Sequence, residues 1–180
     1  MTDYEVSAVY IDALLRALGP KALPAVLEVL DASARPMVAN AWSESWHPAG
    51  LLEALGEAVV TAHGAQALEN LAYTAMKDRF GSIVLPMLKR SLETTQRSPG
   101  AILSKLGSLV EMAMRGLEIV WQPEGQGGVL QIVYPRAVAP HIDHSWRGVL
   151  RFIFEVTQPA KGVEFSRSPD GTTLEYRLSW

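Results

Sequence analysis

The hydrophobic pattern of the chain changes its period near residue 117, and this change most constrains the fold. Before it, apolar residues recur at helical spacing in successive segments that end at glycine or proline. From Leu117 onward, Leu117, Ile119 and Trp121 alternate with the residues between them, a period of two that is typical of a half-buried strand. We therefore predict a helical region over 1–116 and a block of sheet, helix and hairpin over 117–180.

The C-terminal block predicts two hairpins that flank one helix. The sequence EGQGG at 124–128 joins two strand-like runs, and a strand rather than a helix follows it, so it is a hairpin turn and not a phosphate loop. A second turn, Pro-Asp-Gly at 169–171, precedes a strand that ends at Trp180. The helix between the hairpins, from about 144 to 157, is apolar on most sides and should be buried.

The N-terminal region predicts a set of helices. We expect them over about 4–18, from Pro24, over 48–63, 65–80 and 83–94, and from Ser98 to Gly116. The segment 31–47 is less regular. Trp42 and Trp46 are four residues apart and share a face if this segment is helical. In one interpretation they pack the first helices against the rest of the protein. In the other they form the wall of a pocket or an anchor at an interface. Together the patterns predict an α+β fold, in which this helical set packs on a small four-stranded antiparallel sheet.

Composition narrows the class of protein. The chain has 180 residues, which is most simply one domain over 1–180, and its net charge of −3 gives no bulk attraction to nucleic acid. It has no cysteine, so disulfides, thiolate metal sites and a cysteine nucleophile are excluded. The acidic start does not fit a signal peptide, and no apolar run approaches a membrane span. We expect a cytoplasmic protein without a membrane span.

No catalytic motif stands out, and we expect neither enzymatic activity nor a cofactor. The only histidine cluster contains His141, Asp143 and His144. It could hold a divalent metal if a third ligand converged on it, but a polar loop with a helix cap explains the same residues more simply. No pair of carboxylates can be nominated for acid–base chemistry.

Three stretches carry a resemblance: Gly100 with Leu103 and Leu106 in SPGAILSKLGSLVEMAMRG, the run 146–150 (WRGVL), and EYRLSW at the end. They resemble an uncharacterised paralogous family expanded in myxobacteria and, more distantly, the group of haem nitric-oxide-binding domains, 4-vinyl-reductase domains and TRAPP subunits. The resemblance implies an α+β fold with an apolar ligand cavity. The chain lacks the Tyr-x-Ser-x-Arg motif of the haem domains and the cysteines of the other two classes, so the scaffold is implied and the chemistry is not.

Two functional hypotheses follow. The first, which we favour on sequence, is a non-catalytic interaction or scaffold module of a bacterial signalling or regulatory complex, working with a protein partner or as a homodimer and anchored by Trp42 and Trp46. The alternative is a sensor for a small apolar or aromatic molecule, bound in a buried cavity between the helices and the sheet. Candidate lining residues are Trp121, Tyr134, Trp146, Phe152 and Phe154. Ordinary core packing explains the same aromatic residues.

Overall fold

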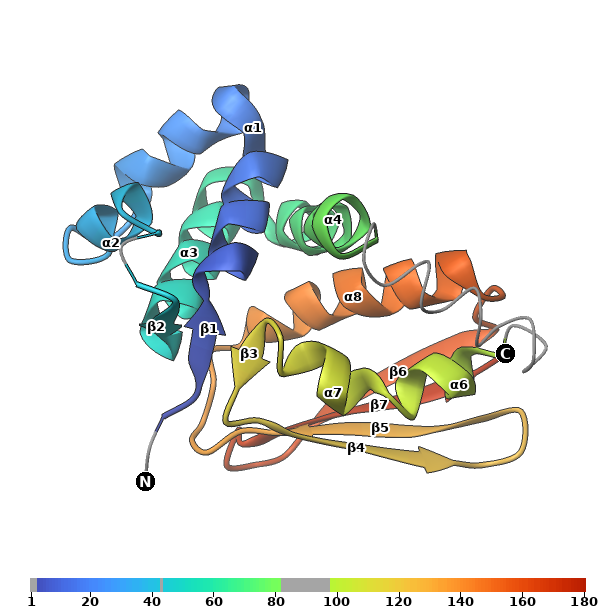
Figure 1. Ribbon diagram of the computed structural model, residues 1–180. Coiled ribbons are helices and arrows are strands. Elements are labelled where there is room, and N and C mark those ends of the chain that lie inside the picture. Colours follow the sequence, from blue (N-terminus) through green and yellow to red (C-terminus); the bar gives the residue numbers. More distant parts are fainter. Residues whose placement is uncertain (1–2, 43, 82–97) are drawn as a thin grey trace.

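The N-terminal half of the chain is mostly helical. A computed structural model describes residues 3–42, 44–81 and 98–180 (Figure 1). The elements up to residue 81 are β1 (Glu5–Ser7), α1 (Ala8–Val29), α2 (Arg35–Ala39), β2 (Trp46–Pro48), α3 (Ala49–His63), α4 (Ala65–Ala75) and the π-helical turn η1 (Met76–Phe80). Gly19 has φ +67° inside α1 and kinks it, at the point where a break was predicted. The helix predicted over 83–94 lies outside the described residues.

The C-terminal half contains the predicted sheet. Its elements are α6 (Pro99–Leu103), α7 (Leu106–Val110), β3 (Met114–Arg115), β4 (Glu118–Pro123), β5 (Gly127–Val133), α8 (Ile142–Val156), β6 (Gly162–Arg167) and β7 (Thr173–Ser179). Four antiparallel strands follow the order β4-β5-β7-β6, so the two predicted hairpins join through β5 and β7. Leu130 lies opposite Tyr176 and Ile132 opposite Leu174, which places the apolar alternation on one face. This confirms the α+β fold and the four-stranded antiparallel sheet.

Helix α8 is buried between two layers, as its composition predicts. It lies over the four-stranded sheet, with α4 on its other side and α6 and α7 beside it (Figure 1). Gly148 allows the close approach of α4, because a Cβ at this position would meet the backbone oxygen of Glu69 and lie 2.8 Å from the backbone nitrogen of Tyr73. The glycine of the WRGVL run thus has a packing role.

A second, three-stranded sheet was not predicted. Its order is β2-β1-β3, and β1 pairs antiparallel with both neighbours. The residues of β1 were predicted to be helical, but the helix begins only at Ala8, where the Ser7 side chain caps it by accepting a hydrogen bond from the Tyr10 backbone nitrogen at 3.2 Å. Strands of two or three residues that pair across long separations leave no local periodicity to detect.

The condition set for the segment 31–47 is not met, and the helix predicted from Ser98 to Gly116 was wrong. Trp42 and Trp46 do not share a helical face, because α2 ends at Ala39 and Trp46 belongs to β2, where it pairs with Ser7. The single helix expected from Ser98 to Gly116 is instead α6 and α7 followed by β3. Pairing of β3 with β1 takes the last residues out of the helical conformation. Within the part of the chain that the structure describes, no helix is long and apolar enough to cross a membrane.

Candidate functional site

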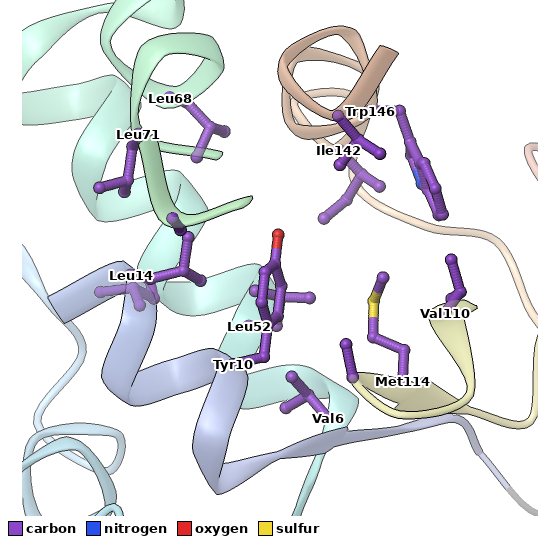
Figure 2. Packing of buried hydrophobic residues seen from close by; sticks show 14 of the residues in the cluster. Val6, Tyr10, Leu14, Leu52, Leu68, Leu71, Val110, Met114, Ile142 and Trp146 are labelled. Carbon is purple, nitrogen blue, oxygen red and sulfur yellow. The ribbon is translucent and has the colours of Figure 1, made fainter. Parts of the chain in front are cut away.

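An apolar cavity lies where α1, α7 and α8 meet. Its volume is about 40 Å³. Figure 2 shows Tyr10, Val110, Met114 and Trp146 approaching this region from elements far apart in sequence. The described residues that line it are Tyr10, Met76, Ile102, Leu106, Leu109, Val110, Ala113, Met114, Trp146, Val149, Phe152, Ile153 and Val156. None of these residues carries a charge, so the cavity suits an uncharged, apolar occupant.

Helical spacing explains how α8 contributes to the cavity. Trp146, Val149, Ile153 and Val156 lie three or four residues apart and therefore form one stripe along α8. The same spacing on α7 brings Leu106, Leu109 and Val110 to one side. Met76, Leu109 and Val156 are half-buried, whereas the other lining residues are buried. These three mark the side on which the cavity approaches the surface.

A smaller chamber of about 10 Å³ adjoins the cavity. It is lined by Tyr4, Tyr10, Leu52, Met114, Tyr134, Ile142, Ser145, Trp146 and Val149, of which Tyr10, Met114, Trp146 and Val149 also line the larger cavity. The Trp146 indole nitrogen donates a 2.6 Å hydrogen bond to the Tyr134 hydroxyl. Its lining includes several tyrosines, but like the larger cavity the chamber exposes mostly hydrocarbon.

The tyrosines around the small chamber are neutral. Burial raises the pKa of Tyr10 to about 12. Burial also raises the pKa values of Tyr134 and Tyr4 far above the ordinary range, and for Tyr4 the Glu53 carboxylate adds to the effect. The Tyr4 hydroxyl donates to Glu53 at 2.9 Å, and the Arg136 guanidinium pairs with the same carboxylate at 2.9 Å. The hydroxyls therefore act as hydrogen-bonding groups without charge.

The aromatic residues predicted to line a cavity divide into two groups. Trp146 and Phe152 line the larger cavity, and Tyr134 lines the small chamber together with Trp146. Trp121 and Phe154 instead pack against Trp180, with ring centroids 5.8 and 6.2 Å from it. They belong to an aromatic cluster at the inner face of the sheet and line neither chamber.

The two tryptophans predicted as anchors are held by different contacts. Trp42 is 55% exposed, and its indole nitrogen donates to Asp12 at 3.3 Å. Trp46 is half-buried, and the Arg115 guanidinium lies 4.5 Å from the centre of its ring. Neither residue lines the apolar cavity. Sequence reasoning did not assign Tyr10 or Met114 to a site, because their role depends on how distant segments pack.

The histidine cluster does not converge with further ligands. Asp143 accepts a hydrogen bond from Arg147 at 3.1 Å, and His144 lies 3.6 Å from the same carboxylate. The His141 ring packs against α3 at Gly56, where an added Cβ would lie 2.9 Å from it. Among the described residues, no three His, Cys, Asp or Glu side chains are placed to hold a metal ion.

His141 should make stability depend on pH. Burial lowers its pKa, although a backbone hydrogen bond with Glu53 and the Glu57 and Glu53 carboxylates oppose the shift. Because the folded pKa lies below the unfolded value of about 6.5, the unfolded chain binds the proton first as the pH falls. The stabilisation is present above about pH 6.5 and is lost below it. We expect His141→Gln to lose less thermal stability than the wild type between about pH 7.5 and 5.5.

The exposed His63 provides the control for this measurement. Its replacement by glutamine shows how the loss of a surface histidine as such affects the drop in melting temperature on acidification. A drop in the His141→Gln protein equal to that of the wild type would show that His141 does not contribute to the pH dependence. Circular dichroism melts at the two pH values provide the comparison.

Comparison with solved structures identifies the architecture. An H-NOX protein from K. algicida, in its Fe(II) unliganded form, matches with a TM-score of 0.64 over 96% of this chain and 95% of that one. The chain has the H-NOX fold. An oxygen-binding H-NOX domain related to soluble guanylate cyclases matches with a TM-score of 0.52 over 95% of this chain and 90% of that domain. Sequence identities are only 12% and 11%, and neither a family model nor a curated sequence matches.

The described residues do not fit a haem. Pockets for ligands of that kind usually measure about 300–1,000 Å³, whereas this cavity holds about 40 Å³. The four histidines of the chain are His47, His63, His141 and His144, and none of them lines the cavity. No cationic side chain of residues 3–42, 44–81 and 98–180 lines it either, so two propionates would find no partner among them. Likeness to H-NOX structures therefore extends to the fold and not to the cofactor.

Proposed function

We propose that the chain is a haem-independent sensor domain that binds a small uncharged molecule in its apolar cavity. The cavity between α1, α7 and α8, whose described lining carries no charge, supports this proposal. Protein interiors contain few voids larger than a water molecule, and empty ones are apolar and able to take up apolar guests. The fold is shared with H-NOX proteins, one of which is an oxygen-binding domain.

Size limits the ligand and its affinity. An engineered apolar cavity of about 150 Å³ holds benzene. The 40 Å³ here leaves room for about four non-hydrogen atoms. At a ceiling of about −1.5 kcal/mol per atom, such a ligand binds with at most about −6 kcal/mol, which corresponds to a Kd of about 40 μM. The chain is thus suited to detect an abundant or locally concentrated compound.

These observations favour the sensor over the interaction module. Trp42 and Trp46 belong to different elements and make separate contacts, so they do not form the shared helical anchor on which that hypothesis depended. A homodimer, a protein partner, a cytoplasmic location, the absence of catalysis and membership of the myxobacterial family stay predictions. A signal from the bound molecule to the rest of the protein would start at the same cavity, because α1 lines one side of it and α7 and α8 line the other sides.

Xenon offers a direct test of the cavity. We expect xenon to shift the methyl NMR signals of Leu106, Val149 and Ile153 saturably. Val149→Phe should fill the cavity and weaken xenon binding by about tenfold or more, roughly 1.4 kcal/mol. Val133→Phe is the matched control, because Val133 lines neither chamber. The absence of any saturable response of the lining methyls in the wild type would overturn the proposal.

A separate experiment tests whether the protein binds haem. The purified chain should develop no protein-bound Soret band when it is mixed with excess haem, because the cavity is small and its described lining offers neither an axial ligand nor a partner for the propionates. A stoichiometric, shifted Soret band would contradict this expectation. Xenon binding in the absence of that band would support the proposed function as stated.

A further inference from the structure

The apolar cavity is long for its volume. Its described lining on α8 runs from Trp146 to Val156, which corresponds to about 15 Å along a helix. The volume spread along this length is only about 40 Å³. Leu106 and Val110 of α7 line another side of the same space. The cavity is therefore a narrow slot along α8, which suits a slender guest better than a ring.

The α8 wall of this slot is stiff. Val149, Ile153 and Val156 are β-branched, and such side chains are held almost entirely in one χ1 rotamer when they lie in a helix. Trp146, at the other end of the stripe, is fixed by its 2.6 Å hydrogen bond to Tyr134. Val149 and Ile153 are 5% and 2% exposed, so their neighbours also hold them in place. A methyl branch on a guest would meet side chains that cannot turn aside at low cost.

The two ends of the slot differ. Tyr10, Met114 and Trp146 surround one end (Figure 2), and the pairing of β1 with β3 ties together the segments that carry Tyr10 and Met114. Ile102 and Val156 line the other end, and Val156 is only half-buried. A linear guest thus has a fixed stop for one methyl end and more room for the other end of its chain.

A polar group on the guest is unfavourable. The described linings of the slot and of the small chamber beside it carry no charge and expose mostly hydrocarbon. A hydroxyl that leaves water for such surroundings loses hydrogen bonds, and the loss weakens binding by about tenfold. The lining therefore favours a hydrocarbon over an alcohol of the same size.

We propose that the cavity binds a short unbranched hydrocarbon, whose chain lies along α8 between Trp146 and Val156. This inference rests on the proposed function and names the chemical class of its ligand. It assigns Ile153 as the residue that sets the preference for an unbranched chain. Ile153 lines the slot between Val149 and Val156, where the branch of a guest would lie.

Two pairs of probes test shape and polarity separately. n-Butane and isobutane are isomers that differ only in branching, whereas n-butane and 1-propanol have the same number of non-hydrogen atoms and differ in a terminal hydroxyl. We expect methyl-detected NMR titrations of the whole chain to give n-butane a Kd about tenfold lower than that of isobutane and that of 1-propanol. The methyl signals of Leu106 and Ile153 are the reporters, since both residues line the slot.

Ile153→Val makes room for a branch, because it removes one methylene group from the α8 wall. Its preference for n-butane over isobutane should fall by about fourfold, the equivalent of one buried methylene. Ile132→Val is the matched control. Ile132 is 0% exposed and lines neither chamber, so the same change there should leave the preference as it is in the wild type. Circular dichroism shows whether both variants are folded.

The outcomes separate this inference from the sensor proposal. Equal affinities of the wild type for n-butane and isobutane, or binding of xenon without n-butane, overturn the inference and leave the sensor proposal standing. Binding of 1-propanol as tight as that of n-butane overturns the choice of a hydrocarbon. An unchanged preference in Ile153→Val contradicts the role of Ile153. No saturable response to xenon or to any of the probes overturns both proposals.

Discussion

Gly148→Ala is expected to destabilise the protein by about 3 kcal/mol, at the upper end of the cost of overpacking. The new Cβ would meet the Glu69 backbone oxygen, the Tyr73 backbone nitrogen at 2.8 Å and the Ala72 Cβ at 2.9 Å. Two of these atoms belong to the backbone of α4 and cannot move aside without shifting the helix. For a chain of this size the loss corresponds to a decrease in melting temperature of about 6–12 °C.

Gly50→Ala is the matched control for Gly148→Ala. Gly50 also lies in a helix, but a Cβ added there has nothing within 4 Å. Because alanine has the higher helix propensity, this variant should be as stable as the wild type or slightly more stable. Urea denaturation monitored by circular dichroism measures both. If the two variants had the same stability, the close packing of α4 on α8 through Gly148 would be refuted.

Trp146→Ala is expected to cost about 4 kcal/mol, as is usual for removing a large aromatic side chain from a core. Trp146 is 2% exposed, lines both chambers and donates the 2.6 Å hydrogen bond to Tyr134. Its removal loses buried apolar area, opens a void and takes a partner from a buried hydroxyl. The two chambers should merge, so the variant should accept larger guests, such as benzene, that the wild type excludes.

Trp42→Ala controls for the loss of a tryptophan as such. Trp42 is 55% exposed, and its indole nitrogen donates a 3.3 Å hydrogen bond to Asp12. We expect a change within about 0.5 kcal/mol, as for most surface substitutions. Equilibrium denaturation gives the stabilities, and benzene titration followed by methyl NMR tests the merged cavity. A Trp146→Ala protein as stable as Trp42→Ala would contradict the core position of Trp146.

The C-terminal block could be predicted from sequence because its signals are local. Three local patterns predict it: the alternation of apolar residues along β4 and β7, the glycine-rich turn, and the apolar composition of α8. Each pattern indicates the type of element and its burial within a few residues of sequence. The small sheet could not be predicted in this way. Val6 fits the helical spacing of the residues that follow it, yet it pairs with His47 and Met114, and only tertiary packing brings these residues together.

The residues of the candidate site, like the fold, could be predicted only in part. Trp146 and Phe152 lie on the apolar stripe of α8, so a pattern of large aromatic residues marked them. Trp121 belongs to the same pattern but stacks on Trp180, because its strand places it at another part of the sheet. Tyr10 looked like one more apolar position of the first helix. Nothing local indicates that it lines a chamber together with Tyr134.

The small sheet fixes one end of the binding site. β1 runs directly into α1, β3 follows α7, and these two strands are hydrogen-bonded, with the Ser7 backbone nitrogen also donating to Ala113 at 2.8 Å. The walls therefore cannot separate near Tyr10 and Met114. We therefore expect any widening of the cavity at the end lined by Ile102, which is away from this sheet. Such a cavity should keep its shape at the end near Tyr10 and Met114 and should admit guests of different length at the other end.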